Sequence, residues 1–406
     1  MHILYVVQYF NLPHEPGGGR AYHFARHWAQ RGNRVTVVAG ALNHKTASVP
    51  EARRGRLFSW EQVDGIDVVY CASSARIRNS IAGRLLNFFG FALLSTWLCL
   101  FRVRRPDVVY ASSTPLTVGL PGCLASVRWR VPFVFEVRDL WPESAIVAGV
   151  LRNRLAIGLA RWLERFLYRR ASHIVAVTRG IRDGIVKCGI PGGKVQLVPN
   201  GVDDLLLSEP QHRPPSPNGR FFQCIYVGAL GRWNGNGTIL EAARHLREDP
   251  VEFVFVGDGD QRGQMEEQVR SEGLSNIRFM GALPKQEAME HLHKADAALI
   301  CTWDHPFHRM VLANKIFDYL AAGKPIVAAA DGEMVELLLT SGAGIAVPPG
   351  PGLAMARAIR QLIELPEDAR REMGRRGRAH VLANYRRSDL AEQVEHALRQ
   401  LAHEAS

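Results

Sequence analysis

The sequence has few cysteines and none of the patterns that would give them a structural role. Its 406 residues include six cysteines, without any C-x-x-C pair and without histidines at zinc-finger spacing. Neither a disulfide framework nor a structural zinc site is therefore expected. The first residues also lack the basic segment and the cleavage site of a signal peptide. We interpret them as a first strand and expect a cytoplasmic protein with reduced thiols.

Long apolar runs are also scarce. The run 85–101 has 17 residues without a charge and is flanked by arginines, whereas a membrane-spanning helix needs about 20 mostly apolar residues. A transmembrane span is the least favoured interpretation. Two others stay open: a buried helix of an α/β domain, or a helix on a membrane surface with its arginines near anionic head groups. The segment 152–170, with six arginines among apolar residues, predicts a basic amphipathic helix that could face the same surface.

The composition is that of an ordinary globular protein, but the charge is uneven. The chain is 47% hydrophobic and 22% charged, which excludes a disordered or fibrous protein. Of its net charge of +11, residues 1–200 contribute +16 and residues 201–406 contribute −5. We therefore expect two domains with different partners. No recognised nucleic-acid-binding motif accompanies the basic charge, so nucleic acid is not an expected partner.

Short apolar runs alternate with helical patterns along the whole chain, which predicts parallel sheets covered by helices on both faces. The expected strands are 2–7, 34–39, 68–70, 108–110, 133–137, 174–177 and 195–198, then 223–227, 252–256, 277–280, 297–301, 325–329 and 345–347. Four prolines mark 208–219 as a linker between an N-terminal domain, 1–207, and a C-terminal domain, 220–387. A final helix, about 388–406, could pack back on the first domain. These features predict two doubly wound α/β domains with a ligand cleft between them.

The loop after the first strand contains three consecutive glycines, Gly17, Gly18 and Gly19, followed by Arg20 and a helical pattern. Glycines permit close approach of the backbone to a ligand, and the first amides of a helix are free to bind an anion. The pattern is not G-x-G-x-x-G, so a dinucleotide site is not indicated. A plain connecting loop remains the alternative.

Charged residues also gather after the expected strand 133–137, where Arg138, Asp139 and Glu143 follow one another closely. Charges at the carboxyl end of a buried strand are costly unless they have a purpose. One interpretation is a structural ion pair between Arg138 and Asp139 or Glu143. The other places Arg138 against an anionic ligand.

In the second half, two loops could hold a phosphate. Arg232 lies among glycines after the first strand of this half, and Asn314 with Lys315 begins a helix. Asn314 could cap that helix, and its free amides with Lys315 would form an anion site. Asp318 lies one turn further on the same face and could accept hydrogen bonds from sugar hydroxyls.

Several motifs, in this order, resemble glycosyltransferase family 4, a family of retaining transferases with the GT-B fold of two Rossmann-like domains. They are GGGR at 17–20, VPNGVD at 198–203, VGALGR at 227–232, VGDG at 256–259, IRFMGALP at 277–284 and NKIFDYLAAGKPI at 314–326. The phrase EVRDLWPES at 136–144 resembles the WbuB-like branch of N-acetyl-L-fucosamine transferases of O-antigen assembly.

The resemblance implies a UDP-sugar donor on the second domain and an undecaprenyl-diphosphate-linked saccharide acceptor on the first, at the cytoplasmic face of an anionic bacterial inner membrane. No metal or cofactor is implied, because basic residues and helix dipoles would stabilise the leaving diphosphate. The implied catalytic residues are Arg138, Asp139 and Asp318. Gly17, Gly19, Arg20 and Glu143 would meet the acceptor or a phosphate. The implied donor-binding residues are Gly18, Gly228, Arg232, Gly257, Asp258, Leu283, Met310, Ala313, Asn314, Lys315 and Asp318.

The sequence departs from the family at several of these positions. Met310 stands where the family has the first glutamate of its E-x7-E pair, and Asp318 stands at the second. Ala229 and Asn234 replace the arginine and lysine of the usual G-R-L-x-x-x-K-G loop, and Arg138 replaces the histidine of a His-Asp pair. Two alternatives therefore stay open: a UDP-sugar epimerase of the same fold, and a non-catalytic nucleotide-sugar-binding partner in a glycan assembly complex.

Overall fold

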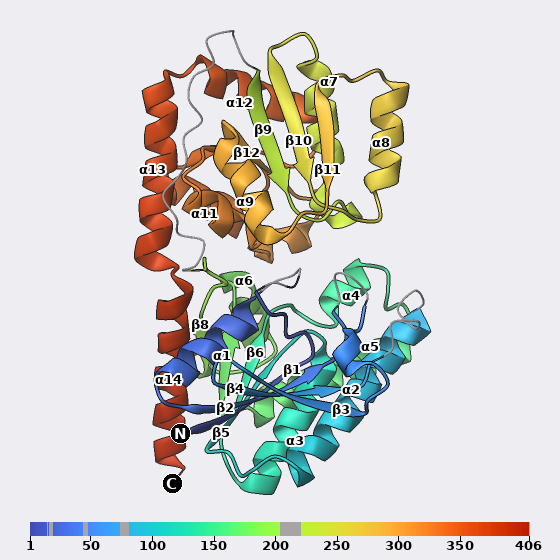
Figure 1. The fold of residues 1–406 in the computed structure, drawn as a ribbon, viewed down its shortest axis with the longest axis vertical. Helices are drawn as coiled ribbons and strands as arrows, with labels where there is room; N and C mark the ends of the chain where they lie inside the picture. Colours follow the sequence, from blue (N-terminus) through green and yellow to red (C-terminus); the bar gives the residue numbers. More distant parts are fainter. Residues whose placement is uncertain (14, 16–18, 44–47, 74–80, 204–220, 406) are drawn as a thin grey trace. The chain divides into compact units, whose positions relative to one another are not determined.

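The computed structural model describes residues 1–13, 15, 19–43, 48–73, 81–203 and 221–405. Gly17, Gly18 and the expected linker 208–219 lie outside these residues. The chain forms two compact units, drawn in Figure 1. The first unit is Met1–Asn200 with Arg387–Ser406, and the second unit is Gly201–Arg386.

The first unit contains an eight-stranded sheet with the order β3-β4-β2-β1-β5-β6-β7-β8. All neighbouring strands are parallel except β3 and β4, which are antiparallel. The strands are β1 (His2–Val7), β2 (Arg34–Gly40), β3 (Phe58–Val63), β4 (Ile66–Cys71), β5 (Val108–Ser112), β6 (Phe133–Val137), β7 (His173–Ala176) and β8 (Val195–Leu197). Most central strands are buried on both faces, as their continuous apolar runs predict.

Helices cover both faces of this sheet (Figure 1). They are α1 (Arg20–Gln30), α2 (Ile81–Phe101), α3 (Gly119–Trp129), α4 (Glu143–Val147), α5 (Arg154–Arg170), α6 (Arg179–Lys187) and the last helix of the chain, α14 (Arg387–Glu404). On one face α14 packs against α1 through a stripe of Leu390, Val394 and Leu398 at helical spacing. The Trp28 indole N–H also donates to the carbonyl of Ala391 at 2.8 Å. Helices α2, α3 and α5 contact strands from the opposite face.

The second unit contains a six-stranded parallel sheet with the order β11-β10-β9-β12-β13-β14. Its strands are β9 (Phe222–Val227), β10 (Val251–Val256), β11 (Ile277–Gly281), β12 (Ala297–Cys301), β13 (Ile326–Ala329) and β14 (Gly344–Val347). Its helices are α7 (Gly237–His245), α8 (Arg262–Ser271), α9 (Lys285–Lys294), α10 (Lys315–Ala321), α11 (Glu333–Ser341), α12 (Gly352–Glu364) and α13 (Glu367–Asn384). Two buried apolar clusters, one on each face of the sheet, form its core.

The structure confirms the predicted class of two doubly wound α/β units. Each of the expected strands coincides with an observed strand to within two residues. The sequence prediction missed β3, whose residues Ser59, Glu61 and Gln62 interrupt its apolar pattern. This strand pairs only with β4 at the sheet edge, so it needs few buried apolar side chains. Among the described residues, no helix is both long enough and apolar enough to cross a membrane.

Candidate functional site

The order of the strands in the second unit defines where a ligand is expected. From β9 the chain runs outward through β10 and β11, and it then returns to the other side of β9 to form β12, β13 and β14. The carboxyl ends of β9 and β12 therefore flank a topological switch point, which is where open parallel α/β sheets bind ligands. The loops that begin at Gly228 and Thr302 lie at this point.

Two predicted donor-binding glycines hold the loops after β9 and β10 against each other. A Cβ atom on Gly257 would lie 1.8 Å from the carbonyl oxygen of Gly228, so only glycine permits this approach. Both glycines also have positive φ, 155° at Gly228 and 148° at Gly257. The Gly228 N–H donates to Val256 O at 2.9 Å and thereby joins the loop after β9 to the end of β10. These glycines thus shape the edge of the switch point.

Lys315, the first residue of α10, reaches the loop after β9. Its Nζ donates to the Tyr226 hydroxyl at 2.6 Å and lies 4.0 Å from the centre of that ring. It also lies 3.0 Å from the position of a Cβ on Gly228. Burial raises the pKa of Tyr226 well above its ordinary value, so the phenol stays neutral and this contact leaves the lysine charge in place. The arrangement places a positive charge at the switch point.

The other predicted residues of the second unit lie around this point. Arg232 begins a short 3-10 helix, Arg232–Asn234, after β9; it is exposed, and within the described residues no hydrogen bond or ion pair is recorded for it. Asp318 pairs with Lys285, with 3.3 Å between Oδ1 and Nζ. The Asp258 carboxylate accepts the N–H of Gly259 at 2.8 Å. Asn314 precedes α10 and is exposed, but its side chain makes no capping hydrogen bond.

The three remaining predicted residues of this unit, Leu283, Met310 and Ala313, have apolar side chains. Leu283 and Ala313 are partly buried against the core cluster. Met310 ends the 3-10 helix Pro306–Met310 and is half-buried. The sequence places Met310 where a carboxylate was expected, and its thioether can supply packing but no charge.

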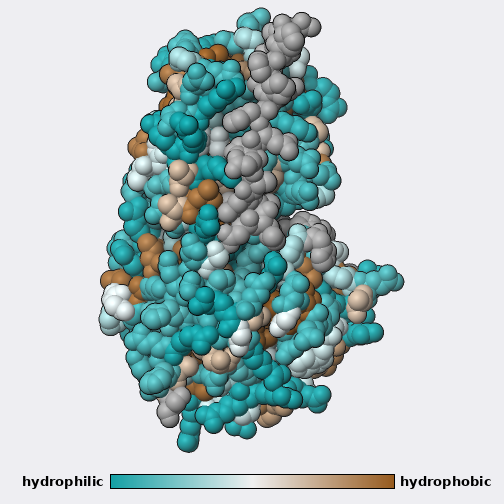
Figure 2. Space-filling view, turned by 60° about the vertical axis from the view of Figure 1, so that its left-hand side comes forward, coloured by the Kyte–Doolittle hydropathy of each residue, from teal (hydrophilic) through white to brown (hydrophobic). Residues whose placement is uncertain are grey.

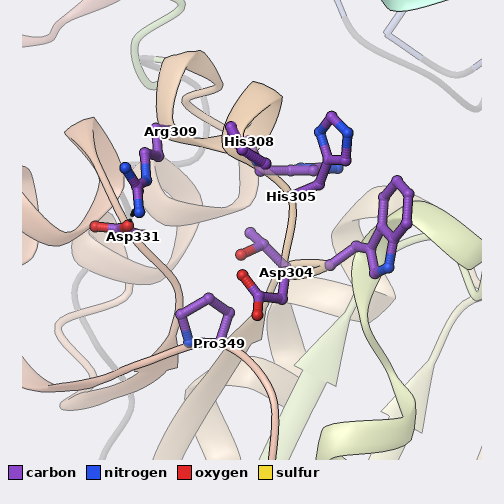
Figure 3. Close-up of a pocket in the computed structure, with 9 residues that line it drawn as sticks. Asp304, His305, His308, Arg309, Asp331 and Pro349 are labelled. Carbon is purple, nitrogen blue, oxygen red and sulfur yellow. Dashed lines mark ion pairs between the residues drawn. The ribbon is translucent and has the colours of Figure 1, made fainter. Parts of the chain in front are cut away.

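A pocket after β12 was not predicted. It is lined by Thr302, Trp303, Asp304, His305, Pro306, His308, Arg309, Asp331 and Pro349. In Figure 3 the side chains of Arg309 and Asp331 face each other, and they form an ion pair at 2.7 Å. Trp303 stacks on His305 with 4.9 Å between ring centres and meets Trp233 edge-on at 5.3 Å. Burial and the neighbouring His305 lower the pKa of His308. The pocket therefore offers aromatic faces and a neutral imidazole. The signal in the sequence was the grouping of two tryptophans and two histidines in the loops after β9 and β12.

In the first unit, Arg20 is buried rather than open to solvent. Its Nε donates to Glu136 at 2.8 Å, and both side chains are at most 2% exposed. Its other nitrogens donate to the carbonyls of Val198 and Pro199. Burial alone would raise the pKa of Glu136, but the nearby Arg20 and Arg138 bring it below its ordinary value. These hydrogen bonds join the end of the segment Met1–Asn200 to the sheet of the first unit. Gly19 immediately precedes α1.

Arg138, Asp139 and Glu143 all follow β6, but they do not pair with one another. The Arg138 Nε is buried and has no hydrogen-bond partner among the described residues. Burial raises the pKa of Asp139 to about 6. Glu143 instead pairs with Arg161 of α5 at 3.0 Å. The expected alternative of a structural ion pair between Arg138 and Asp139 or Glu143 is therefore not observed among the described residues.

No metal cluster is present in the described part of the chain: it contains no group of three or more His, Cys, Asp or Glu side chains that could hold an ion.

Matches of this chain to models of known protein families identify the class to which it belongs. Residues 17–201 match the family model described as glycosyl transferase 4-like domain, and residues 222–365 match glycosyl transferases group 1. Together the two matches cover most of the chain. The chain therefore contains two glycosyltransferase domains and belongs to the glycosyltransferases of the GT-B type.

Relatives and solved structures agree with this class. The chain is 27% identical over 275 residues to a protein of Pseudomonas aeruginosa described as glycosyltransferase WbjE, covering 65% of this chain and 68% of that protein. It is 25% identical over 359 residues to a protein of Escherichia coli K12 described as the colanic acid biosynthesis glycosyl transferase WcaI, covering 84% and 86%. The structure of Anabaena HepE in complex with UDP superposes with a TM-score of 0.71 at 18% identity, covering 99% and 100%. The sucrose-phosphate synthase of Thermosynechococcus elongatus superposes with a TM-score of 0.74 at 17% identity over all of both chains. These two structures show the fold.

Proposed function

We propose that the protein is a retaining, metal-independent glycosyltransferase that acts at the cytoplasmic face of the bacterial inner membrane. It moves an N-acetylated hexosamine or deoxyhexosamine, such as N-acetyl-L-fucosamine, from a UDP-sugar to an undecaprenyl-diphosphate-linked saccharide in the synthesis of O-antigen or another surface polysaccharide. The observation that carries the proposal is the positive charge of Lys315 beside Gly228 at the switch point of the second unit. The UDP bound to the similarly folded HepE and the description of WcaI support the choice of donor and pathway class.

The second unit would hold the donor. Arg232 and Lys315 would contact its diphosphate, since two cations can stabilise the charge that develops on the leaving group. Asp318 would accept a hydrogen bond from the ribose. The backbone near Gly257 and Leu283 would contact the nucleobase.

The first unit would hold the acceptor. Arg138 follows β6 and is only half-buried, so its guanidinium could donate to an acceptor phosphate or sugar oxygen. Asp139, with its pKa raised to about 6, is mostly ionised at neutral pH and is more basic than an ordinary carboxylate. It could therefore orient the attacking hydroxyl. In a front-face reaction, the departing phosphate would take the proton of that hydroxyl, and no protein nucleophile would be needed.

The test is transfer from a panel of UDP-sugars to a polyprenyl-diphosphate saccharide, with the product identified by mass spectrometry. Arg232→Ala and Lys315→Ala should each lower kcat/KM about tenfold to hundredfold, because each removes a charge-assisted hydrogen bond to the diphosphate. Arg270→Ala is the matched control, since Arg270 is an exposed arginine of α8 whose side chain pairs with Glu267. It should leave kcat/KM unchanged.

Other outcomes would select the alternatives. An epimer formed from the UDP-sugar alone would identify an epimerase. Stabilisation of the protein by UDP-sugars without turnover would indicate a non-catalytic binding partner. Full turnover in both Arg232→Ala and Lys315→Ala would refute the phosphate assignment.

A further inference from the structure

One side of α2 is apolar and exposed from Leu85 to the end of the helix at Phe101. From Leu86 on, its exposed apolar side chains recur every three to four residues, as Leu86, Phe89, Leu93, Trp97 and Phe101, and Leu85 is exposed next to the first of them. Leu93 is 73% exposed and Phe101 is 67% exposed, whereas Phe91 and Leu98 on the opposite side are almost fully buried. The helix therefore lies along the surface of the first unit, with one side packed inward and an apolar side outward.

The neighbouring helices extend this apolar surface. Helix α3 contacts both α2 and α5, so the three helices form one layer on the sheet (Figure 1). Nineteen large apolar side chains are exposed in the described part of the chain, and eleven of them lie in this layer. Besides the six of α2, they are Leu124, Val127, Leu155, Leu159 and Trp162. On the face of the protein drawn in Figure 2, hydrophobic residues occur in groups among hydrophilic ones. Monomeric soluble proteins rarely expose large contiguous apolar patches without a binding partner.

The charge of this layer is almost entirely positive. The three helices contain a single acidic residue, Glu164, which is buried and accepts a hydrogen bond from Tyr168. The exposed arginines in the layer or directly after its helices are Arg102, Arg104, Arg105, Arg128, Arg130, Arg154, Arg161, Arg165, Arg169 and Arg170, and of these Arg161 pairs with Glu143 of α4. The Arg102 guanidinium lies 5.9 Å from the Trp97 ring at the end of the α2 stripe.

The combination of exposed apolar side chains and positive charge on α2, α3 and α5 favours one kind of binding partner for this surface. A second copy of the chain would bring arginines against arginines with almost no carboxylates to pair with them. An anionic bilayer offers hydrocarbon for the apolar side chains and phosphate groups for the arginines. We propose that the outer surface of α2, α3 and α5 binds an anionic lipid bilayer and keeps the first unit at the interface. Its biological role rests on the proposed function, since a polyprenyl-linked acceptor resides in that bilayer.

The experiment is flotation of the full chain with vesicles of phosphatidylcholine alone or mixed with phosphatidylglycerol. The protein should float with the anionic vesicles far more than with the neutral ones, and added salt should weaken the binding. Leu93→Glu and Leu159→Glu should each lower the partition coefficient about tenfold or more, because each moves a charge into the apolar contact. Leu339→Glu, at a 60% exposed leucine of α11, is the matched control and should bind as the unchanged protein does.

A second set of variants tests the charge separately. Arg104→Gln, Arg154→Gln and Arg169→Gln should each weaken anionic-vesicle binding about fivefold. The proposal is overturned if the unchanged protein ignores anionic vesicles, binds neutral vesicles equally, or retains its binding in both glutamate variants. A dimer that the glutamate variants dissociate, without vesicle binding, would identify a second copy as the occupant instead. Transfer to a short-chain, water-soluble acceptor is measured in parallel. Vesicle binding without transfer would refute the proposed function alone, and transfer without vesicle binding would refute this surface alone.

Discussion

The two units share an architecture but differ in how deeply their charged side chains are buried. Each has a mostly parallel sheet with helices on both faces. In the first unit a complete ion pair, Arg20–Glu136, is buried, and two carboxyl groups, Asp139 and Glu164, have raised pKa values because they are buried. In the second unit the ion pairs between described residues, such as Arg371–Glu367, are largely exposed. One fold can therefore carry very different electrostatics, and functional differences must be sought in particular side chains.

The largest expected effect concerns the buried pair of the first unit. Arg20→Met should lower the free energy of unfolding by about 3–5 kcal/mol, because it leaves the Glu136 carboxylate buried without its partner. Hydrogen exchange, which reports the first unit separately, and urea unfolding would measure the loss. The double variant Arg20→Met/Glu136→Met should lose less than the single variant, since no unpaired charge remains.

The control for this prediction lies in the second unit. Arg371→Ala removes an exposed pair on α13 and should cost about 0.5 kcal/mol or less. Equal losses from Arg20→Met and Arg371→Ala would contradict the contrast between a buried and an exposed pair.

The next effect is a pH dependence specific to the first unit. Burial raises the pKa of Glu164 from its ordinary value of 4.5 to about 7. The folded protein therefore favours the protonated carboxyl, and this contribution is complete below pH 4.5 and lost as the pH rises through about 7. Glu164→Gln mimics the neutral form, so it should stabilise the protein at pH 8 by about 1–3 kcal/mol and change little at pH 4.

Unfolding at the two pH values measures this difference directly. Glu267→Gln is the matched control, because Glu267 is an exposed glutamate of the second unit. It should have nearly the same effect at both pH values. A stabilisation by Glu164→Gln that is larger at pH 4 than at pH 8 would reverse the assigned sign.

Much of the fold could be predicted because buried parallel strands need continuous apolar runs. Strand β3 was not predicted, because an edge strand can be half polar and then lacks a continuous apolar run. The run 85–101 left two interpretations open, since the sequence showed no clear polar side. The structure shows that Phe91 is buried while Leu93 is exposed, so the run has an inner and an outer side. That distinction depends on tertiary packing, which hydropathy alone does not encode.

The site was predictable where residues form local motifs and unpredictable where distant residues meet. The helix that begins at Lys315 was found, but its contact with Tyr226, 89 residues away, was not. The resemblance implied that Arg20 meets the acceptor or a phosphate, but its hydrogen bond to Glu136, 116 residues away, was not predicted. The residues that line the pocket around Trp303 lie outside the motifs on which the family resemblance rests.

The smallest expected effect is a change in Michaelis constants, and it distinguishes Arg138 of the first unit from Arg232 of the second by the substrate that each is proposed to bind. Arg138→Gln in the first unit should raise the KM for the acceptor about tenfold and leave the KM for the donor unchanged. Arg232→Gln in the second unit should do the reverse, because the proposed donor diphosphate lies at the switch point of that unit. Initial rates over a grid of donor and acceptor concentrations would give both constants. If both variants changed the same KM, the division of donor and acceptor between the two units would be wrong, even if each arginine proved necessary for transfer.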